Sequence, residues 1–72
     1  MNMTIVEKSH RNENYCIELT IEFAYGRSYY QVSACPLIDD GTCGSPIREI
    51  TYSLNDKKNA YATFNRYKRK YI

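Results

Sequence analysis

The chain has no tryptophan, only three glycines and two prolines, and no long apolar run. With so little glycine and proline and with 43% hydrophobic residues, it is typical of a folded domain and not of a disordered or low-complexity chain. No segment reaches the roughly eighteen apolar residues that span a membrane, so we expect no membrane partner. The N-terminal residues lack the apolar core of a signal peptide, which predicts a cytoplasmic protein.

The length of the chain, 72 residues, is enough for one domain, residues 1–72, with a thin core. A chain of this size buries about 60% of the surface that its unfolded form exposes, so we expect modest stability. Tyrosine is unusually common, with eight tyrosines against two phenylalanines. A tyrosine ring combines a large apolar body with a polar hydroxyl, so it suits both a thin core and a contact surface.

The three cysteines, Cys16, Cys35 and Cys43, have no framework spacing. Together with His10 they have the residue types of a zinc site, but structural zinc sites usually contain ligand pairs about two to four residues apart, which this chain lacks. A Cys35–Cys43 disulfide would require an oxidising compartment. We therefore expect three reduced thiols, no metal site and no cofactor.

The charge is unevenly distributed, although the net charge is only +2. Residues 56–72 contain six lysines and arginines against one aspartate, a net of +5, whereas residues 1–55 have a net of −3. This distribution predicts a basic element attached to a mildly acidic body.

The clearest structural pattern is the alternation from Tyr15 to Tyr25, where odd positions are apolar or aromatic and even positions are mostly polar or small. It predicts a half-buried strand over 15–25. Residues 3–9 favour a short edge strand, followed by a polar turn. Gly26-Arg27 predicts a type II′ hairpin turn leading into a strand over 28–37, because glycine accepts the positive φ at the first turn position.

The predicted turn sets the pairing of the hairpin, in which partner numbers sum to 53. The pairs on the apolar face are Phe23–Tyr30, Ile21–Val32 and Leu19–Ala34, and those on the other face are Glu22–Gln31, Thr20–Ser33 and Glu18–Cys35. Every apolar pair falls on one face, which supports the turn assignment.

The remaining elements are a loop over 38–46, a strand over 48–54 and a helix over about 56–71. In the strand, Ile50, Tyr52 and Leu54 are expected to face inward. Ser53 and Asp56 have the spacing of a capping box, with Asn55 as the rival N-cap. The helix carries an apolar stripe of Ala60, Phe64, Tyr67 and Tyr71, flanked by Tyr61.

The predicted fold class is α+β, an antiparallel β meander of three to four strands with one C-terminal helix packed on one face. The residues expected between the sheet and the helix are Ile17, Leu19, Ile21, Phe23, Tyr30, Val32, Ile50, Tyr52 and Phe64. Catalytic residues are not evident, because the only histidine, His10, is predicted in a polar turn and no motif ties a serine or cysteine to it. We expect a non-enzymatic protein.

Two surfaces are candidate partner-binding sites. The first is the basic helix, with Lys58, Arg66, Arg69 and Lys70, where Tyr61 or Tyr71 are available for stacking. The alternative is a solvated helix face whose cations favour the helix C-terminus. The second is the outward sheet face, with Glu18, Glu22 and an exposed Tyr29. Its alternative is plain solvent surface, which is common for one side of an antiparallel sheet.

In its size, its β-sheet-plus-helix layout and its lack of catalytic groups, the chain resembles the small orphan proteins of phages and mobile elements, of which the anti-CRISPR proteins are the best-known functional group. The resemblance covers the whole chain and rests on no specific motif. It implies stoichiometric binding, in a bacterial host cell, to a Cas effector or its ribonucleoprotein. Many anti-CRISPR proteins are acidic nucleic-acid mimics, and the net charge of +2 departs from that pattern.

The leading functional hypothesis is therefore a non-enzymatic inhibitor that acts by protein–protein binding and blocks a Cas effector. The alternative is a small nucleic-acid-binding protein that uses the basic helix. A third possibility is a homodimer, in which edge strand 3–9 or the outward sheet face pairs with a second copy.

Overall fold

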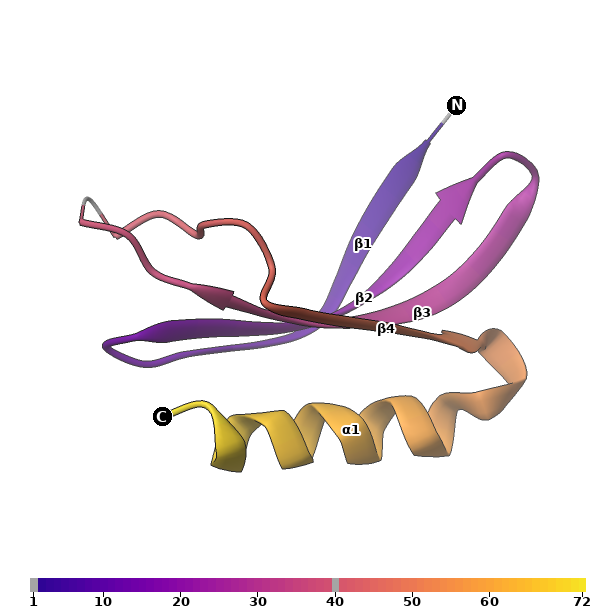
Figure 1. Ribbon diagram of the computed structural model, residues 1–72. Coiled ribbons are helices and arrows are strands. Elements are labelled where there is room, and N and C mark those ends of the chain that lie inside the picture. The colour runs from indigo at the N-terminus through magenta and orange to yellow at the C-terminus, as the bar shows by residue number, and fades with distance from the viewer. Residues whose placement is uncertain (1, 40) are drawn as a thin grey trace.

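The computed structural model describes residues 2–39 and 41–72, which form an antiparallel sheet and one long helix (Figure 1). The strands are β1 (Met3–Arg11), β2 (Tyr15–Ala24), β3 (Arg27–Pro36) and β4 (Arg48–Ser53), and they lie in the order β1-β2-β3-β4. A 3₁₀ turn, η1 (Leu54–Asp56), leads into helix α1 (Lys57–Lys70). The predicted α+β fold is confirmed, with the ends of its elements shifted by one or two residues.

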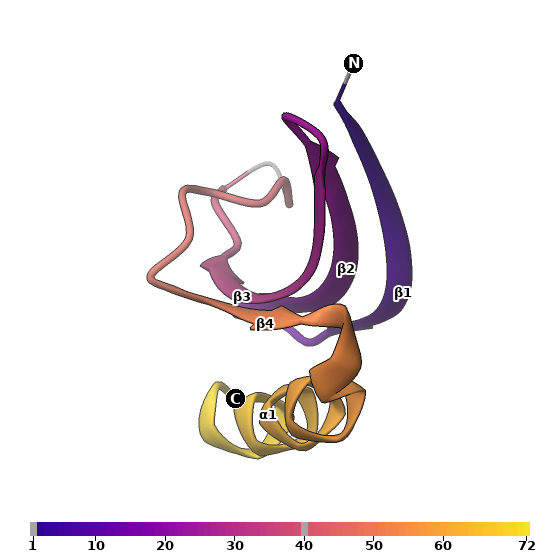
Figure 2. The ribbon, with the colours of Figure 1, turned by 90° about the vertical axis from the view of Figure 1, so that its right-hand side faces the viewer.

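The sheet is curved, and α1 lies on its convex side (Figures 1 and 2). In Figure 2, β1, β2 and β3 bend around the opposite, concave side, where the segment between β3 and β4 also lies. We call this concave side the outer face. Its central polar residues are Glu18, Thr20, Glu22, Gln31, Ser33 and Glu49.

The β2–β3 hairpin turns at Tyr25-Gly26, one residue earlier than the predicted Gly26-Arg27 turn. Both turn residues have positive φ, +54° at Tyr25 and +74° at Gly26, which is typical of a type I′ and not of a type II′ turn. Each residue of β2 therefore pairs two positions earlier along β3 than predicted. The observed pairs include Ile17–Ala34, Leu19–Val32 and Ile21–Tyr30 on the helix side, and Cys16–Cys35, Glu18–Ser33, Thr20–Gln31 and Glu22–Tyr29 on the outer face. A shift by two preserves the faces, so each side chain stays on its predicted side.

Strand β1 contains a β-bulge, because Glu7 lies between the paired residues Val6 and Lys8 and has no partner on β2. The side chains of β1 on the helix side are Met3 and Ile5 before the bulge, and Lys8 and His10 after it. The bulge also places Arg11 on the outer face, opposite Cys16. His10 thus lies in a strand and not in the predicted turn.

The start of α1 differs from the predicted capping box. Ser53 caps η1, where its Oγ accepts a hydrogen bond from the backbone N–H of Asn55 at 3.2 Å. Asp56 is the N-cap residue of α1, but its Oδ1 accepts a hydrogen bond from Asn59 Nδ2 at 2.7 Å and none from the helix backbone. The 3₁₀ turn accounts for the difference, since it separates the serine from the first turn of α1.

Asn12 connects the β1–β2 hairpin to the end of the helix. Its Oδ1 accepts hydrogen bonds from the backbone N–H groups of Asn14 and Tyr15, both at 2.8 Å. Its Nδ2 donates to the carbonyl oxygen of Tyr71 at 2.9 Å. One side chain therefore stabilises a tight turn and pairs a carbonyl at the C-terminus of α1.

The core lies between α1 and the two central strands. Its buried residues are Ile17, Leu19, Tyr30, Val32, Ala34, Ala60, Phe64 and Tyr67. The predicted helix stripe is confirmed, with Tyr61 and Tyr71 partly buried at its margins. Thr63 is also buried, and its hydroxyl shares a hydrogen bond with the hydroxyl of Tyr52.

Two predictions about burial are wrong. Ile50 lies opposite Val32 on the helix side of the sheet, as predicted, but it is 37% exposed. Leu54, which lies in η1 and not in the strand, is 41% exposed. The reason is that β4 is an edge strand that ends at Ser53, while α1 also spreads over β2 and β3. Conversely, part of the outer face is closed to solvent. The buried residues there are Cys16, Thr20, Ser33 and Cys35, around which the curvature of the sheet gathers neighbouring side chains.

Candidate functional site

The outer face holds the carboxylate of Glu22 in a fixed position. Thr4 Oγ1 of β1 donates a hydrogen bond to Glu22 Oε1 at 2.6 Å, and Thr20 Oγ1 of β2 donates to Glu22 Oε2 at 2.6 Å. Each carboxylate oxygen can accept more than one hydrogen bond, so both remain able to bind a further donor. The hydroxyl groups orient the carboxylate but do not neutralise its charge.

Two further glutamates lie on the same face. Gln31 Nε2 of β3 donates a hydrogen bond to Glu49 Oε1 of β4 at 2.8 Å. Glu18 lies on β2 opposite Ser33, and Ser33 is in turn opposite Glu49. The predicted partner-binding residues Glu18 and Glu22 therefore share a face with Glu49. All three glutamates lie on strands, which position side chains more precisely than loops do.

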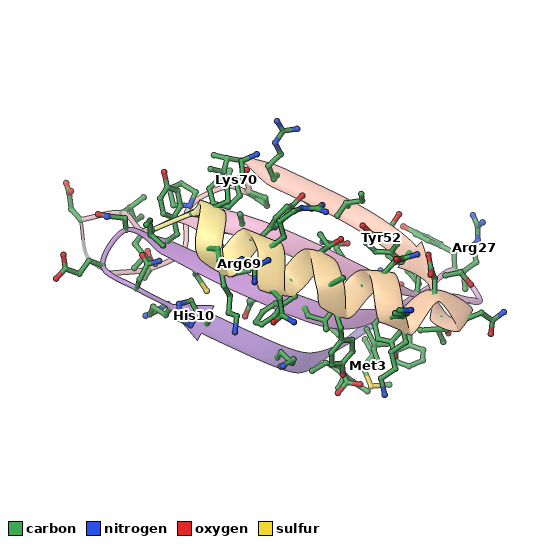
Figure 3. All side chains as sticks on the ribbon, turned by 90° about the horizontal axis from the view of Figure 1, so that it is seen from below. Met3, His10, Arg27, Tyr52, Arg69 and Lys70 are labelled. Carbon is green, nitrogen blue, oxygen red and sulfur yellow. The ribbon has the colours of Figure 1, made fainter. Side chains whose placement is uncertain are left out.

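Tyr29 is half-buried and not exposed as predicted. It lies opposite Glu22 on β2 and opposite Ser53 on β4. It also lines an open groove of about 600 Å³ at this end of the sheet, with Arg27, Ser28, Thr51, Tyr52 and Ser53 as its other lining residues. Figure 3 labels two of these residues, Arg27 and Tyr52, at the end of the molecule where α1 begins. We call this feature the hairpin groove.

Tyr25 is the most exposed large hydrophobic side chain among the described residues, with 90% of its surface accessible. The sequence pattern places it on the core side of a strand, whereas it lies in the turn at the tip of the hairpin. Its backbone adopts a left-handed conformation that few bulky residues occupy. An exposed aromatic ring in a strained turn is a candidate contact residue. The sequence did not indicate this role, because the alternation continues to position 25 and predicts a strand residue there.

The predicted basic residues of α1 fall into two groups. All four are exposed, and Lys58 and Arg69 lie near the two ends of the helix. Arg66 and Lys70 lie against aromatic rings of their own helix, at 5.9 Å from the ring centre of Tyr67 and 5.4 Å from that of Tyr71. Figure 3 shows Arg69 and Lys70 near the C-terminal end of α1.

A lysine of β1 also contacts aromatic rings of α1. The Nζ of Lys8 lies 5.5 Å from the ring centres of both Tyr61 and Phe64. The Nζ of Lys57 lies 5.3 Å from the ring centre of Tyr61, and that of Lys68 lies 5.5 Å from the ring centre of Phe64. Contacts of this kind at exposed sites are worth about 0.5–1 kcal/mol each, so part of the positive charge of α1 contributes to packing.

The tyrosines that were expected to be available for stacking are engaged within the protein. The ring of Tyr71 lies 5.4 Å from those of both Tyr15 and Tyr67. The ring of Tyr61 packs edge-on against Tyr30 at 6.3 Å. Stacking of either ring on a nucleobase would have to compete with these contacts.

Three cysteines meet near the far end of the outer face from the hairpin groove. Cys16 and Cys35 are direct partners on β2 and β3, and both are buried. Cys43, in the loop between β3 and β4, is exposed, and Arg11 Nη2 lies 3.7 Å from its Sγ. We call these cysteines and Arg11 the thiol cluster. The alternation predicts Cys16 and Cys35 on this face. No sequence pattern predicts that the loop between β3 and β4 brings Cys43 to it.

The thiol cluster perturbs the ionisation of its members. Burial raises the pKa of Cys16 to about 11, and a hydrogen bond with the Cys43 thiol adds to the rise. Burial also raises the pKa of Cys35, and the neighbouring Cys43 contributes. Hydrogen bonds to the thiols of Cys43 and Cys16 raise the pKa of the Arg11 guanidinium. Both buried cysteines are therefore neutral thiols near pH 7.

Within residues 2–39 and 41–72, no three or more histidine, cysteine, aspartate or glutamate side chains are grouped so that they could hold a metal ion. In the same part of the chain, no helix has the length and apolar character needed to cross a membrane. No protein-family model matches the chain, and no curated protein or solved structure is significantly similar to it.

Proposed function

We propose that this protein is a non-enzymatic inhibitor of the anti-CRISPR type, which binds a Cas effector through its outer face and blocks the effector. The observation that supports this proposal is the set of three glutamates, two of them fixed by hydrogen bonds, on a concave surface that the helix leaves uncovered. A protein that binds nucleic acid must present a basic surface, and such a surface is complementary to this face.

The separation of charge supports a local acidic contact despite the net charge of +2. Glu18, Glu22 and Glu49 lie on one side of the sheet, whereas the basic residues of α1 lie on the other. Carboxylates that are already oriented lose little conformational freedom when a lysine or arginine of a partner binds them. Electrostatic complementarity of this kind increases the association rate and selects the partner.

The tip of the β2–β3 hairpin extends the proposed contact surface. Tyr29 joins the hairpin groove to the outer face, since it lies opposite Glu22. Tyr25 provides an exposed ring at the tip itself. Tyrosines are enriched among the residues that dominate binding energy at protein interfaces.

Charge reversal on each surface tests the proposal. The variant Glu18→Lys/Glu22→Lys/Glu49→Lys should lose co-purification with the target Cas effector and should no longer inhibit cleavage. The matched control Lys58→Glu/Arg69→Glu should retain both properties. Circular dichroism must show that both variants are folded. Retained inhibition in the glutamate variant, or absence of any complex and of inhibition across a panel of effectors with the unaltered protein, would contradict the proposal.

A small nucleic-acid-binding protein is the second candidate, and the exposure of Lys58 and Arg69 favours it. Filter binding at two salt concentrations distinguishes the two functions, because phosphate contacts weaken steeply as salt rises. In this case Lys58→Glu/Arg69→Glu should abolish binding and the glutamate variant should not. Absence of binding at low salt would exclude this second function.

A further inference from the structure

The thiol cluster brings an exposed cysteine from a loop against a buried cysteine of the sheet. The backbone sets this position. Leu37 forms an isolated bridge with Cys43, and the N–H of Gly44 donates to the carbonyl oxygen of Pro36 at 2.7 Å. At the same end, the N–H of Leu37 donates to the carbonyl oxygen of Asn14 at 2.9 Å. Leu37 thus lies between Asn14 and Cys43, and the loop is held against the end of β3. From there the Cys43 thiol comes within 3.7 Å of Nη2 of Arg11, which lies opposite Cys16.

Gly44 contributes to this close approach. A Cβ atom at this position would lie 3.3 Å from the carbonyl oxygen of Pro36 and 3.3 Å from the Cγ2 atom of Ile38. Such contacts are tighter than ordinary van der Waals contacts, so a larger residue would push the loop away from β3. The absence of a side chain at Gly44 therefore helps to keep Cys43 next to the sheet.

The contacts of the thiols distinguish between the two buried cysteines. Arg11 Nη2 lies 3.7 Å from Cys43 Sγ, and Arg11 is the direct partner of Cys16 on β2. Cys35 lies one strand further from Arg11, on β3. This arrangement selects Cys16 as the neighbour of Cys43, in contrast to the Cys35–Cys43 pair considered from the sequence.

We propose that Cys43 and Cys16 form a thiol–disulfide pair, which exchanges with low-molecular-weight disulfides and, when oxidised, ties the loop between β3 and β4 to strand β2. Cys43 is the attacking residue because it is exposed, and Cys16 is the resolving residue because it is buried beside Cys43. An accessible cysteine next to a second cysteine is the usual arrangement of a redox-responsive pair. This inference does not depend on the proposed function.

The exchange proceeds in two balanced steps. The Cys43 thiol loses its proton, and its sulfur attacks one sulfur of the small disulfide, whose S–S bond breaks and releases one thiolate. The Cys16 thiol then loses its proton, and its sulfur attacks the Cys43 sulfur and releases the second thiolate. The two protein thiols are oxidised, the small disulfide is reduced by two electrons, and the two leaving thiolates take up the two protons.

The test uses the full chain and oxidised glutathione as the probe. After incubation, free thiols are blocked with N-ethylmaleimide, and the product is analysed by mass spectrometry with peptide mapping. We expect an intramolecular Cys16–Cys43 disulfide, an unmodified Cys35, slower proteolysis of the 37–47 loop, and a melting temperature at least about 5 °C higher.

Two variants serve as controls. Cys35→Ser should still form the disulfide, whereas Cys43→Ser should retain free Cys16 and Cys35 thiols. Because Cys43 is exposed, its replacement should not disturb folding. A disulfide that involves Cys35, a glutathione adduct on Cys43 that Cys16 does not resolve, linkage only between chains, or three free thiols after incubation would each overturn the inference.

Discussion

The strained turn at Tyr25 predicts that a single substitution will stabilise the protein. Tyr25 has a φ of +54°, and a left-handed conformation costs a residue with a Cβ atom about 1–2 kcal/mol. Asparagine tolerates this conformation, and Asn-Gly is the preferred pair for a type I′ turn. Because Tyr25 is 90% exposed, its replacement removes almost no buried surface. Tyr25→Asn should therefore stabilise the protein by about 1 kcal/mol.

A gain of this size should raise the melting temperature by about 4–8 °C in a domain of this length. Urea titration with linear extrapolation measures the free energy of unfolding directly. The matched control is Gly26→Ala, which should lower stability by about 1 kcal/mol because φ at this residue is +74°. If Tyr25→Asn left stability unchanged or reduced it while Gly26→Ala behaved as expected, the assignment of strain to Tyr25 would be refuted. If Tyr25 is a contact residue, the stabilised variant should also bind the effector more weakly.

Three further predictions concern the core and the thiols. Phe64→Ala should lower the free energy of unfolding by about 3–5 kcal/mol, since Phe64 is only 2% exposed; a loss below about 1 kcal/mol in urea titration would contradict its place in the core. Tyr52→Phe should cost about 1 kcal/mol by removing the hydrogen bond to buried Thr63, and Thr51→Val on the opposite side of β4 is its control. Burial raises the pKa of Cys16 to about 11, so the unfolded state loses the Cys16 proton at a lower pH than the folded state does, and the stability should fall as pH rises from about 9 to 11. Melting curves of the Cys16→Ala variant should show a smaller decline in melting temperature over this pH range. Equal declines in the two proteins would refute the assignment.

The alternation in the sequence predicted the faces of the central strands but not their pairing. Gly26 indicates a hairpin turn, yet glycine accepts positive φ at the first position of a type II′ turn as well as at the second position of a type I′ turn. The bulky Tyr25 favoured the first of these, because tyrosine rarely adopts a left-handed conformation. Pairing along the whole β2–β3 ladder outweighs the local cost at one residue, and no local pattern contains that information.

The candidate site was only partly predictable for the same reason. Glu18 and Glu22 follow from the period of β2, but the hydrogen bond that Thr4 donates to Glu22 depends on how β1 pairs with β2. The bulge at Glu7 has no glycine to mark it. The thiol cluster depends on the path of the loop between β3 and β4, which is set by backbone hydrogen bonds to the end of β3.

The bulge at Glu7 decides which side of the sheet the second half of β1 serves. If β1 paired with β2 without a bulge, Glu7 would lie opposite Leu19, and every side chain from Lys8 to Arg11 would exchange sides. Lys8 would leave the rings of Tyr61 and Phe64, and Arg11 would point away from the thiols of Cys16 and Cys43. Deletion of Glu7, in contrast, would leave a regular ladder with the same pairs, because Lys8 would follow Val6 directly. A contact of the helix and a member of the thiol cluster therefore both depend on one extra residue staying outside the ladder.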